Sequence, residues 1–122
     1  MHDKLKEAIS LFNRRAYFES HEILEGMWQT ATEEADKTFY ESLIRFATGL
    51  HLRFNRRNRQ GAINLLTQGL MKIEEYRPTH LGVDVVRLYD DIAAHVESLK
   101  ATESADPGFL ERWRVPRIKT VE

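Results

Sequence analysis

Apolar residues recur every three or four positions along most of the chain, and no segment alternates apolar and polar residues as a half-buried β-strand does. A period of three to four places the apolar side chains on one face of an α-helix. The pattern therefore predicts an all-α fold, in which about five helices form a compact bundle. The expected helices cover approximately residues 3–13, 17–30, 34–55, 58–77 and 84–100.

The sequence also predicts how helices begin and connect. Asp3 and Asn58 are residue types that cap helix N-termini, and we expect each to begin a helix. Only about three residues separate the first two expected helices, which is typical of an antiparallel helical hairpin. The tetrapeptide Phe-Asn-Arg-Arg occurs at residues 12–15 and again at 54–57, each time between two expected helices. This repetition favours a bundle built from helical hairpins.

The helical period is lost near residue 101, and the segment that follows contains two of the three prolines. We expect residues 1–100 to form a single domain, as chains of 122 residues commonly do, and residues 101–122 to form an extended C-terminal tail. The tail carries three large apolar side chains that suit docking on the bundle: Phe109, Leu110 and Trp113.

The second expected helix carries a histidine and a glutamate one turn apart, His21 and Glu25, among aromatic residues. At about 100° per residue, both lie in the arc between Tyr17 and Phe18 on a helical wheel, and Trp28 lies close to Tyr17. If all three aromatic side chains meet the core, His21 and Glu25 are at least half buried. Buried ionisable groups need partners, so this helix is a candidate site.

The following helix offers a third polar group, His51, on its apolar side. If the two helices pack together, we expect a polar pocket lined by Tyr17, His21, Glu25, Trp28 and His51. One interpretation is an internal hydrogen-bond network that fixes how the helices pack. Another is a pocket for a small ligand.

A metal site is a further interpretation of the same residues. His21 and Glu25 have the i, i+4 spacing by which one helix offers two ligands, and Glu22 follows the histidine as in H-E-x-x-H metalloproteases. With His51 as a third ligand the set would suit a divalent metal, and Glu22 would be the catalytic base for a bound water. Because position 25 is glutamate, the helix supplies a single imidazole. Binding without a cofactor is therefore the main expectation.

One dense run of arginines follows the third expected helix: Arg53, Arg56, Arg57 and Arg59. Cations at the C-terminal end of a helix complement its dipole, which is the simpler interpretation. The alternative is a basic patch for an anion or an RNA backbone. Exposed aromatic residues do not interleave with the run, so nucleic-acid binding is not favoured.

Composition narrows the chemistry further. The chain has no cysteine, which excludes disulfides, thiolate metal sites and thiol nucleophiles, and its net charge of −1 is not typical of a nucleic-acid wrapper. The first residues lack the apolar core of a signal peptide, and no apolar run has the length of a membrane span. We expect a cytoplasmic protein without a membrane partner.

The residues also resemble a known family, the helical family called domain of unknown function 309. Its pattern is Phe-Asn-x-x-x-Tyr-Phe-Glu-x-His-Glu-x-x-Glu-x-x-Trp, followed by a helix that ends in histidine and then by Asn-x-x-Gly-Ala. The matching residues are Phe12, Asn13, Tyr17, Phe18, Glu19, His21, Glu22, Glu25, Trp28, His51, Asn58, Gly61 and Ala62. The resemblance covers roughly residues 5–95 and implies a compact helical bundle, but no activity. Arg15 stands where many members have glycine.

These patterns favour a small binding or interaction module for a ligand or protein partner that the sequence does not name. A metal-dependent, hydrolase-like enzyme that uses Glu22 is the first alternative. An RNA-associated accessory protein that uses the arginines is the second. A symmetric homodimer is compatible with the sequence on base rates alone.

Overall fold

Five helices follow one another in the computed structural model, which describes residues 1–101 and 115–121. They are α1 (Asp3–Asn13), α2 (Tyr17–Thr30), α3 (Glu34–Phe54), α4 (Arg59–Ile73) and α5 (Val85–Ala101). The predicted all-α bundle of about five helices is confirmed. Within the described residues, none of these helices combines the length and apolar character that a membrane crossing requires.

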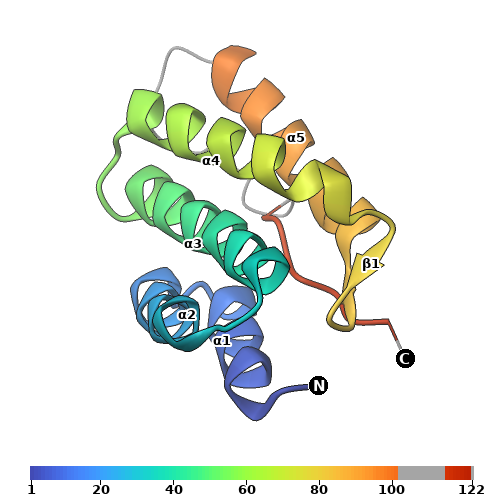
Figure 1. The fold of residues 1–122 in the computed structure, drawn as a ribbon. Helices are drawn as coiled ribbons and strands as arrows, with labels where there is room; N and C mark the ends of the chain where they lie inside the picture. Colours follow the sequence, from blue (N-terminus) through green and yellow to red (C-terminus); the bar gives the residue numbers. More distant parts are fainter. Residues whose placement is uncertain (102–114, 122) are drawn as a thin grey trace.

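The helices are layered in sequence order. Each packs mainly against the next along the chain, so that α3 lies between the α1–α2 hairpin and α4 (Figure 1). The side chains of Phe39, Leu43, Phe46 and Leu50 on α3 are fully buried. The wide apolar face of this helix therefore serves both neighbours, as expected for a central helix.

The repeated Phe-Asn-Arg-Arg segments mark two similar turns. The second arginine of each, Arg15 and Arg57, has a left-handed backbone with φ of 67° and 51°. This conformation costs a non-glycine residue roughly 1 kcal/mol. Glycine would adopt the same conformation without that cost.

The two predicted N-caps had different outcomes. Asn58 caps α4 as predicted, and its Oδ1 atom accepts a hydrogen bond from the Gly61 amide at 2.9 Å. The prediction for Asp3 is wrong by one position. His2 is the cap of α1, with its Nδ1 atom accepting from the Lys4 amide at 3.0 Å, and Asp3 is the first helical residue. A carboxylate there still complements the helix dipole.

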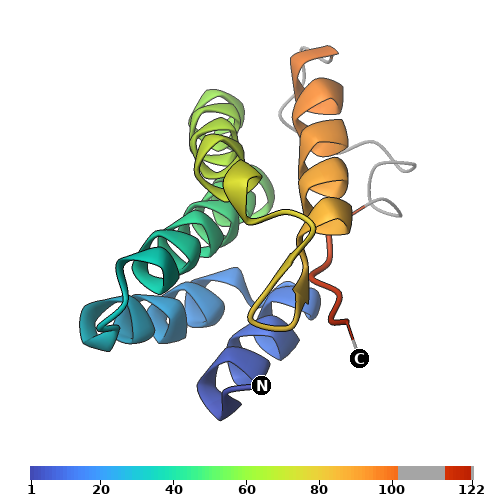
Figure 2. The same ribbon diagram turned by 45° about the vertical axis from the view of Figure 1, so that its right-hand side comes forward.

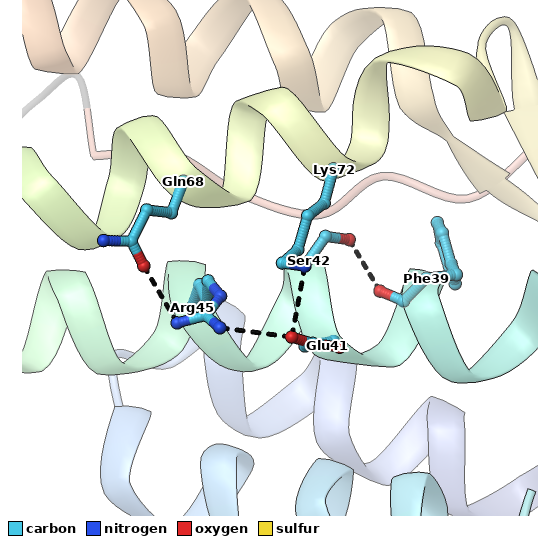
Figure 3. Close-up of polar contacts among 6 residues, drawn as sticks. All are labelled: Phe39, Glu41, Ser42, Arg45, Gln68 and Lys72. Atoms are coloured by element: carbon cyan, nitrogen blue, oxygen red, sulfur yellow. Dashed lines mark hydrogen bonds and ion pairs between the residues drawn. The ribbon is translucent and has the colours of Figure 1, made fainter.

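The outer edge of the α3–α4 contact carries a chain of polar bonds (Figure 3). Glu41 Oε1 lies 3.1 Å from Arg45 Nη2 and 3.2 Å from Lys72 Nζ, and Arg45 Nη1 donates to Gln68 Oε1 at 2.9 Å. Burial acts to raise the pKa of Glu41, but the hydrogen bonds and charges of Lys72 and Arg45 together lower it. The network therefore ties α4 to α3 at a fixed register.

A β-hairpin separates α4 from α5, where the sequence predicted only a loop. After a short 3₁₀ helix, η1 (Glu74–Tyr76), the strands β1 (Thr79–His80) and β2 (Val83–Asp84) pair antiparallel. Leu81 and Gly82 between them have φ of 49° and 81°, the backbone pattern of a type I′ turn. Two-residue strands are too short to show an alternating pattern, so the hydrophobic pattern does not reveal them.

The described part of the tail, residues 115–121, runs down beside the start of α5 and the end of α1 (Figure 2). Pro116 and Ile118 are buried, and Thr120 forms an antiparallel bridge with Val83. The three residues predicted to dock the tail lie outside the described residues: Phe109, Leu110 and Trp113. The division into a domain at residues 1–100 and a tail at residues 101–122 stays a prediction.

Candidate ligand pocket

A pocket of about 330 Å³ lies between α2 and α3. Its volume is at the lower end of the range for small-molecule sites. One wall comes from the first two turns of α2. The other comes from the end of α3 and from Arg56, the second residue beyond that helix. The lining residues are Tyr17, Phe18, His21, Thr48, His51, Leu52 and Arg56.

The rotation of α2 decides which of its side chains reach the pocket. Its buried residues are Tyr17, Ser20, Leu24 and Met27. Ser20 fits inside because its hydroxyl donates to the Ala8 carbonyl of α1 at 2.8 Å, which satisfies the polar group. The centre of the buried face is thus turned toward Ser20 and Met27, and away from Phe18, which is 51% exposed. The condition under which both His21 and Glu25 would be buried, that Phe18 meets the core, is therefore not met.

His21 and Glu25 form a pair at the edge of α2. The Nε2 atom of His21 lies 2.8 Å from Glu25 Oε2, with side-chain exposures of 26% and 48%. The Nδ1 atom of His21 is buried and makes no hydrogen bond with residues 1–101 or 115–121. The sequence predicted that both groups line the pocket, whereas Glu25 sits outside the pocket lining and holds the imidazole from the solvent side.

His51 faces the same pocket from α3, as the sequence predicted. The Phe18 ring lies between the two imidazoles, with centroid distances of 5.8 Å to His21 and 5.9 Å to His51. The ring nitrogens of His51 make no hydrogen bond with the described residues. A ligand in the pocket therefore meets one aromatic face and one imidazole whose polar atoms are available.

Tyr17 forms the deep end of the pocket. Its ring packs edge-on against Phe12 at 5.4 Å and stacks on Phe54 at 6.2 Å. Burial raises the pKa of Tyr17 to about 12, although the nearby Arg15 guanidinium acts in the opposite direction. No hydrogen bond of ordinary geometry reaches the hydroxyl oxygen from the part of the chain that the structure describes, so the contact with Arg15 is mainly electrostatic. Tyr17 remains neutral near pH 7.

The pocket lining carries a positive charge and no negative charge. Arg56 is exposed at the pocket mouth and makes no ion pair with the described residues. Thr48 adds a hydroxyl, and neither aspartate nor glutamate is among the lining residues. The pocket thus combines apolar and aromatic walls with hydrogen-bond donors and a single permanent cation.

The structure brings together three of the five predicted pocket residues. Tyr17, His21 and His51 line the cavity, whereas Glu25 contacts it only through His21. Trp28 lies elsewhere on α2, half-buried, with the Lys37 ammonium 5.1 Å from its ring centroid.

Glu22, the predicted catalytic base, lines a separate cavity of about 540 Å³ between the start of α1 and α2. The predicted metal ligands are also not gathered. Within residues 1–101 and 115–121, no three side chains of His, Cys, Asp or Glu are grouped closely enough to hold a metal ion. This holds for the set of His21, Glu25 and His51. A metal-dependent role for these residues stays a prediction without a supporting arrangement.

The four arginines of the predicted basic patch do not share one surface. Arg53 is fully buried, whereas Arg56 and Arg57 are exposed. Arg59 donates to the Leu99 carbonyl at 2.7 Å and thereby neutralises the C-terminal end of α5. Arg53 lies in the last turn of α3, where the dipole interpretation expects a cation, whereas Arg59 acts at the end of α5. Arg56 alone joins the pocket.

The sequence reasoning missed four lining residues: Phe18, Thr48, Leu52 and Arg56 as part of this site. Thr48, His51 and Leu52 have i, i+3 and i+4 spacing, so they share one side of α3. Reading this side of α3 together with the flank of α2 that carries His21 would have found them. Counting apolar residues alone did not, because a pocket wall mixes polar and apolar side chains.

Comparison with known proteins places the chain in a family. The family model described as Domain of unknown function (DUF309) matches residues 5–65, a span that contains every lining residue of the pocket. An uncharacterized protein of Aquifex aeolicus (strain VF5) is 32% identical over 99 residues. The match covers 81% of this chain and 28% of that relative, so the chain spans less than a third of the relative's length. Because the family model matches residues 5–65, half of the chain, the chain belongs to the DUF309 family.

Proposed function

We propose that this chain is a binding module for a small organic anion with an apolar body, held between α2 and α3. The single observation that carries the proposal is the composition of the pocket. Its lining offers Arg56, His51 and Thr48 as polar groups, and no carboxylate. A cation would meet no counter-charge there, whereas an anion would meet a guanidinium, the side chain that binds carboxylates and phosphates with paired hydrogen bonds.

The remaining lining residues suit the apolar part of such a ligand. Tyr17, Phe18 and Leu52 supply aromatic and aliphatic surface. His21 contributes its ring face, because its Nε2 atom is engaged by Glu25 and its Nδ1 atom is buried. The volume of about 330 Å³ fits a single small ring or a short aliphatic chain with one anionic group.

Calorimetric titration of the full chain with benzoate and phenyl phosphate tests this proposal. We expect both to bind, and benzylamine, which has a similar ring but the opposite charge, to bind at least about 10-fold more weakly. Arg56→Gln should weaken the anions by about 10-fold, in line with the 1–3 kcal/mol of a charged hydrogen bond. Arg87→Gln, an exposed arginine of α5, is the matched control. Equal binding of amine and acid would refute the proposal.

The two alternative functions that the sequence suggests can be tested on the same protein. Metal analysis of untagged protein, compared with His21→Ala, tests the metal-dependent enzyme. RNA binding that is lost in Arg56→Ala/Arg57→Ala would support the RNA-associated role, since phosphate contacts act through such exposed cations. Cytoplasmic location and a homodimer also remain proposals.

A further inference from the structure

The C-terminal tail is held by the backbone of its residues as much as by their side chains. Asn13, the last residue of α1, donates from Nδ2 to the Ile118 carbonyl at 2.9 Å and accepts from the Ile118 amide at Oδ1 at 2.7 Å. The Asp84 amide donates to the Lys119 carbonyl at 2.8 Å, and the Val121 amide donates to the Gly82 carbonyl at 2.9 Å. Ile118 itself is buried. The tail therefore joins α1 to the β-hairpin.

Asn13, which holds the tail, is close in sequence to residues that form a wall of the pocket. Four residues after Asn13, the chain enters α2 at Tyr17, the deep end of the pocket. The turn between them is tight, with the Ala16 amide bonded to the Leu11 carbonyl at 2.9 Å and Arg15 in the left-handed region. Movement of Asn13 would thus reach Tyr17 through a short and constrained segment.

The same turn carries a side chain that supports the pocket from behind. The Arg15 guanidinium lies 4.5 Å from the centroid of the Phe54 ring, on which Tyr17 stacks. It also acts on the Tyr17 hydroxyl electrostatically. Arg15 therefore links the turn, Tyr17 and the end of α3, which are the parts that set the depth of the pocket.

We propose that residues 115–121 act as a strap whose docking on Asn13 sets the geometry of the pocket through the turn at residues 14–16. With the strap docked, two hydrogen bonds fix the side-chain amide of Asn13, and the turn holds Arg15 and Tyr17 in place. With the strap released, the Asn13 side chain loses both bonds, and the turn keeps only its own backbone bonds and the contact of Arg15 with Phe54. The effect on ligand affinity rests on the proposed function, but the effect on the pocket residues does not.

Two variants of the full chain loosen the strap from opposite sides. Asn13→Ala removes both side-chain bonds. Ile118→Pro removes the amide that donates to Asn13 and leaves α1 and α2 unchanged in sequence. Tyr76→Phe is the matched control, since it removes one hydroxyl bond, to the Ala35 carbonyl at 2.6 Å, from the opposite end of α3.

The first readout is the NMR spectrum without ligand. Both strap variants should shift the amide signals of residues 15–18 and the ring signals of His21 and His51, whereas Tyr76→Phe should not. The second readout is benzoate affinity, which should fall by about 5-fold in both variants, the lower end of typical coupling between sites. Because coupling is reciprocal, benzoate should in turn slow hydrogen exchange at the Ile118 and Val121 amides.

The possible outcomes separate the two proposals. Tail signals that shift while residues 15–18 and His51 stay unchanged would overturn the strap. If the pocket signals shift in both variants but no anion binds the unaltered chain, the strap is supported and the proposed function is refuted. If Asn13→Ala does not fold, Ile118→Pro decides the matter, because its change lies outside every helix.

Discussion

The Nε2 atom of His21 lies 2.8 Å from the Oε2 atom of Glu25, one turn further along α2. The pair sits at the boundary between pocket and solvent, with the imidazole more covered than the carboxylate. A pair in such a position orients the ring more than it stabilises the fold. Its energetic worth is therefore that of a surface pair on one helix.

Replacing Glu25 tests this assignment. Glu25→Gln should change the free energy of unfolding by less than about 0.5 kcal/mol, because exposed i, i+4 pairs contribute only that much. The measurement is urea unfolding at neutral pH. A loss above about 2 kcal/mol would indicate a buried, paired charge, which is the state the wheel predicted.

Tyr17 should make the protein sensitive to alkali. Burial raises the pKa of Tyr17 from 10.0 to about 12, so the neutral form stabilises the folded state fully below pH 10. That contribution is lost as the pH rises from about 10 toward 12, because only the unfolded chain ionises readily there. Urea unfolding at a series of pH values should show a smaller alkaline loss for Tyr17→Phe. Some loss should remain, since burial also raises the pKa of Tyr40 and Tyr76. Identical pH profiles would contradict this prediction.

Glu41 should have the opposite dependence. Although burial acts to raise its pKa, the bonds from Lys72 and Arg45 lower the pKa below its ordinary value of 4.5. The stabilisation is therefore present above the unfolded-state pKa and is lost as the pH falls through the folded-state pKa. Glu41→Gln should lower the free energy of unfolding at pH 7 by about 0.5 kcal/mol. The difference should nearly vanish in acid, and a difference that does not depend on pH would point to packing instead.

Two glycines in helices should respond to alanine in opposite directions. At Gly26 of α2 a Cβ atom would have no neighbour within 4 Å, so Gly26→Ala should raise the free energy of unfolding by roughly 0.5–1 kcal/mol through helix propensity. At Gly69 of α4 it would lie 2.5 Å from the Phe46 ring and 3.1 Å from the Ser42 carbonyl oxygen. Gly69→Ala should therefore cost roughly 1–3 kcal/mol. Thermal unfolding of both variants checks the pair, and a stabilised Gly69→Ala would show that α3 and α4 can separate easily.

The hairpin turn offers a stabilising change. Leu81 is exposed and has φ of 49° in a turn where both central residues have positive φ. Asparagine is favoured at the first position of such a turn, so Leu81→Asn should raise the melting temperature by a few degrees, as about 0.5–1 kcal/mol does in a domain of this size. Leu81→Val is the contrasting control, because a branched side chain tolerates positive φ poorly. A lower melting temperature for asparagine would mean that the leucine side chain has an apolar contact of its own.

The helices could be predicted from sequence because the residues that begin and end them act locally. The first two expected ranges match α1 and α2, and Asn58 begins α4 where its residue type suggested. The hairpin at residues 79–84 could not be predicted, since its turn is Leu-Gly and its strands have two residues each. Turn types of this kind depend on backbone conformation that the residue types only weakly indicate.

The site was predicted in part, and the error has one cause. The wheel of α2 was centred on its aromatic residues, but Ser20 lies in the core because its hydroxyl donates a hydrogen bond to the Ala8 carbonyl. Turning the helix toward Ser20 moves Phe18 outward and Glu25 to the rim. A serine that is satisfied by a neighbouring helix cannot be recognised without knowing that helix's position. His51 was found because it interrupts an otherwise apolar stripe.

The pairing of Asn13 with Ile118 joins positions 105 residues apart, whereas the helices contact their neighbours in sequence. Local contacts form quickly, and the closure of a long loop is slower because of its entropic cost. The helices should therefore pack together before residues 115–121 dock beside α1. During synthesis on the ribosome, α1 would emerge and pack against α2 before Ile118, the partner of Asn13, is translated about a hundred codons later.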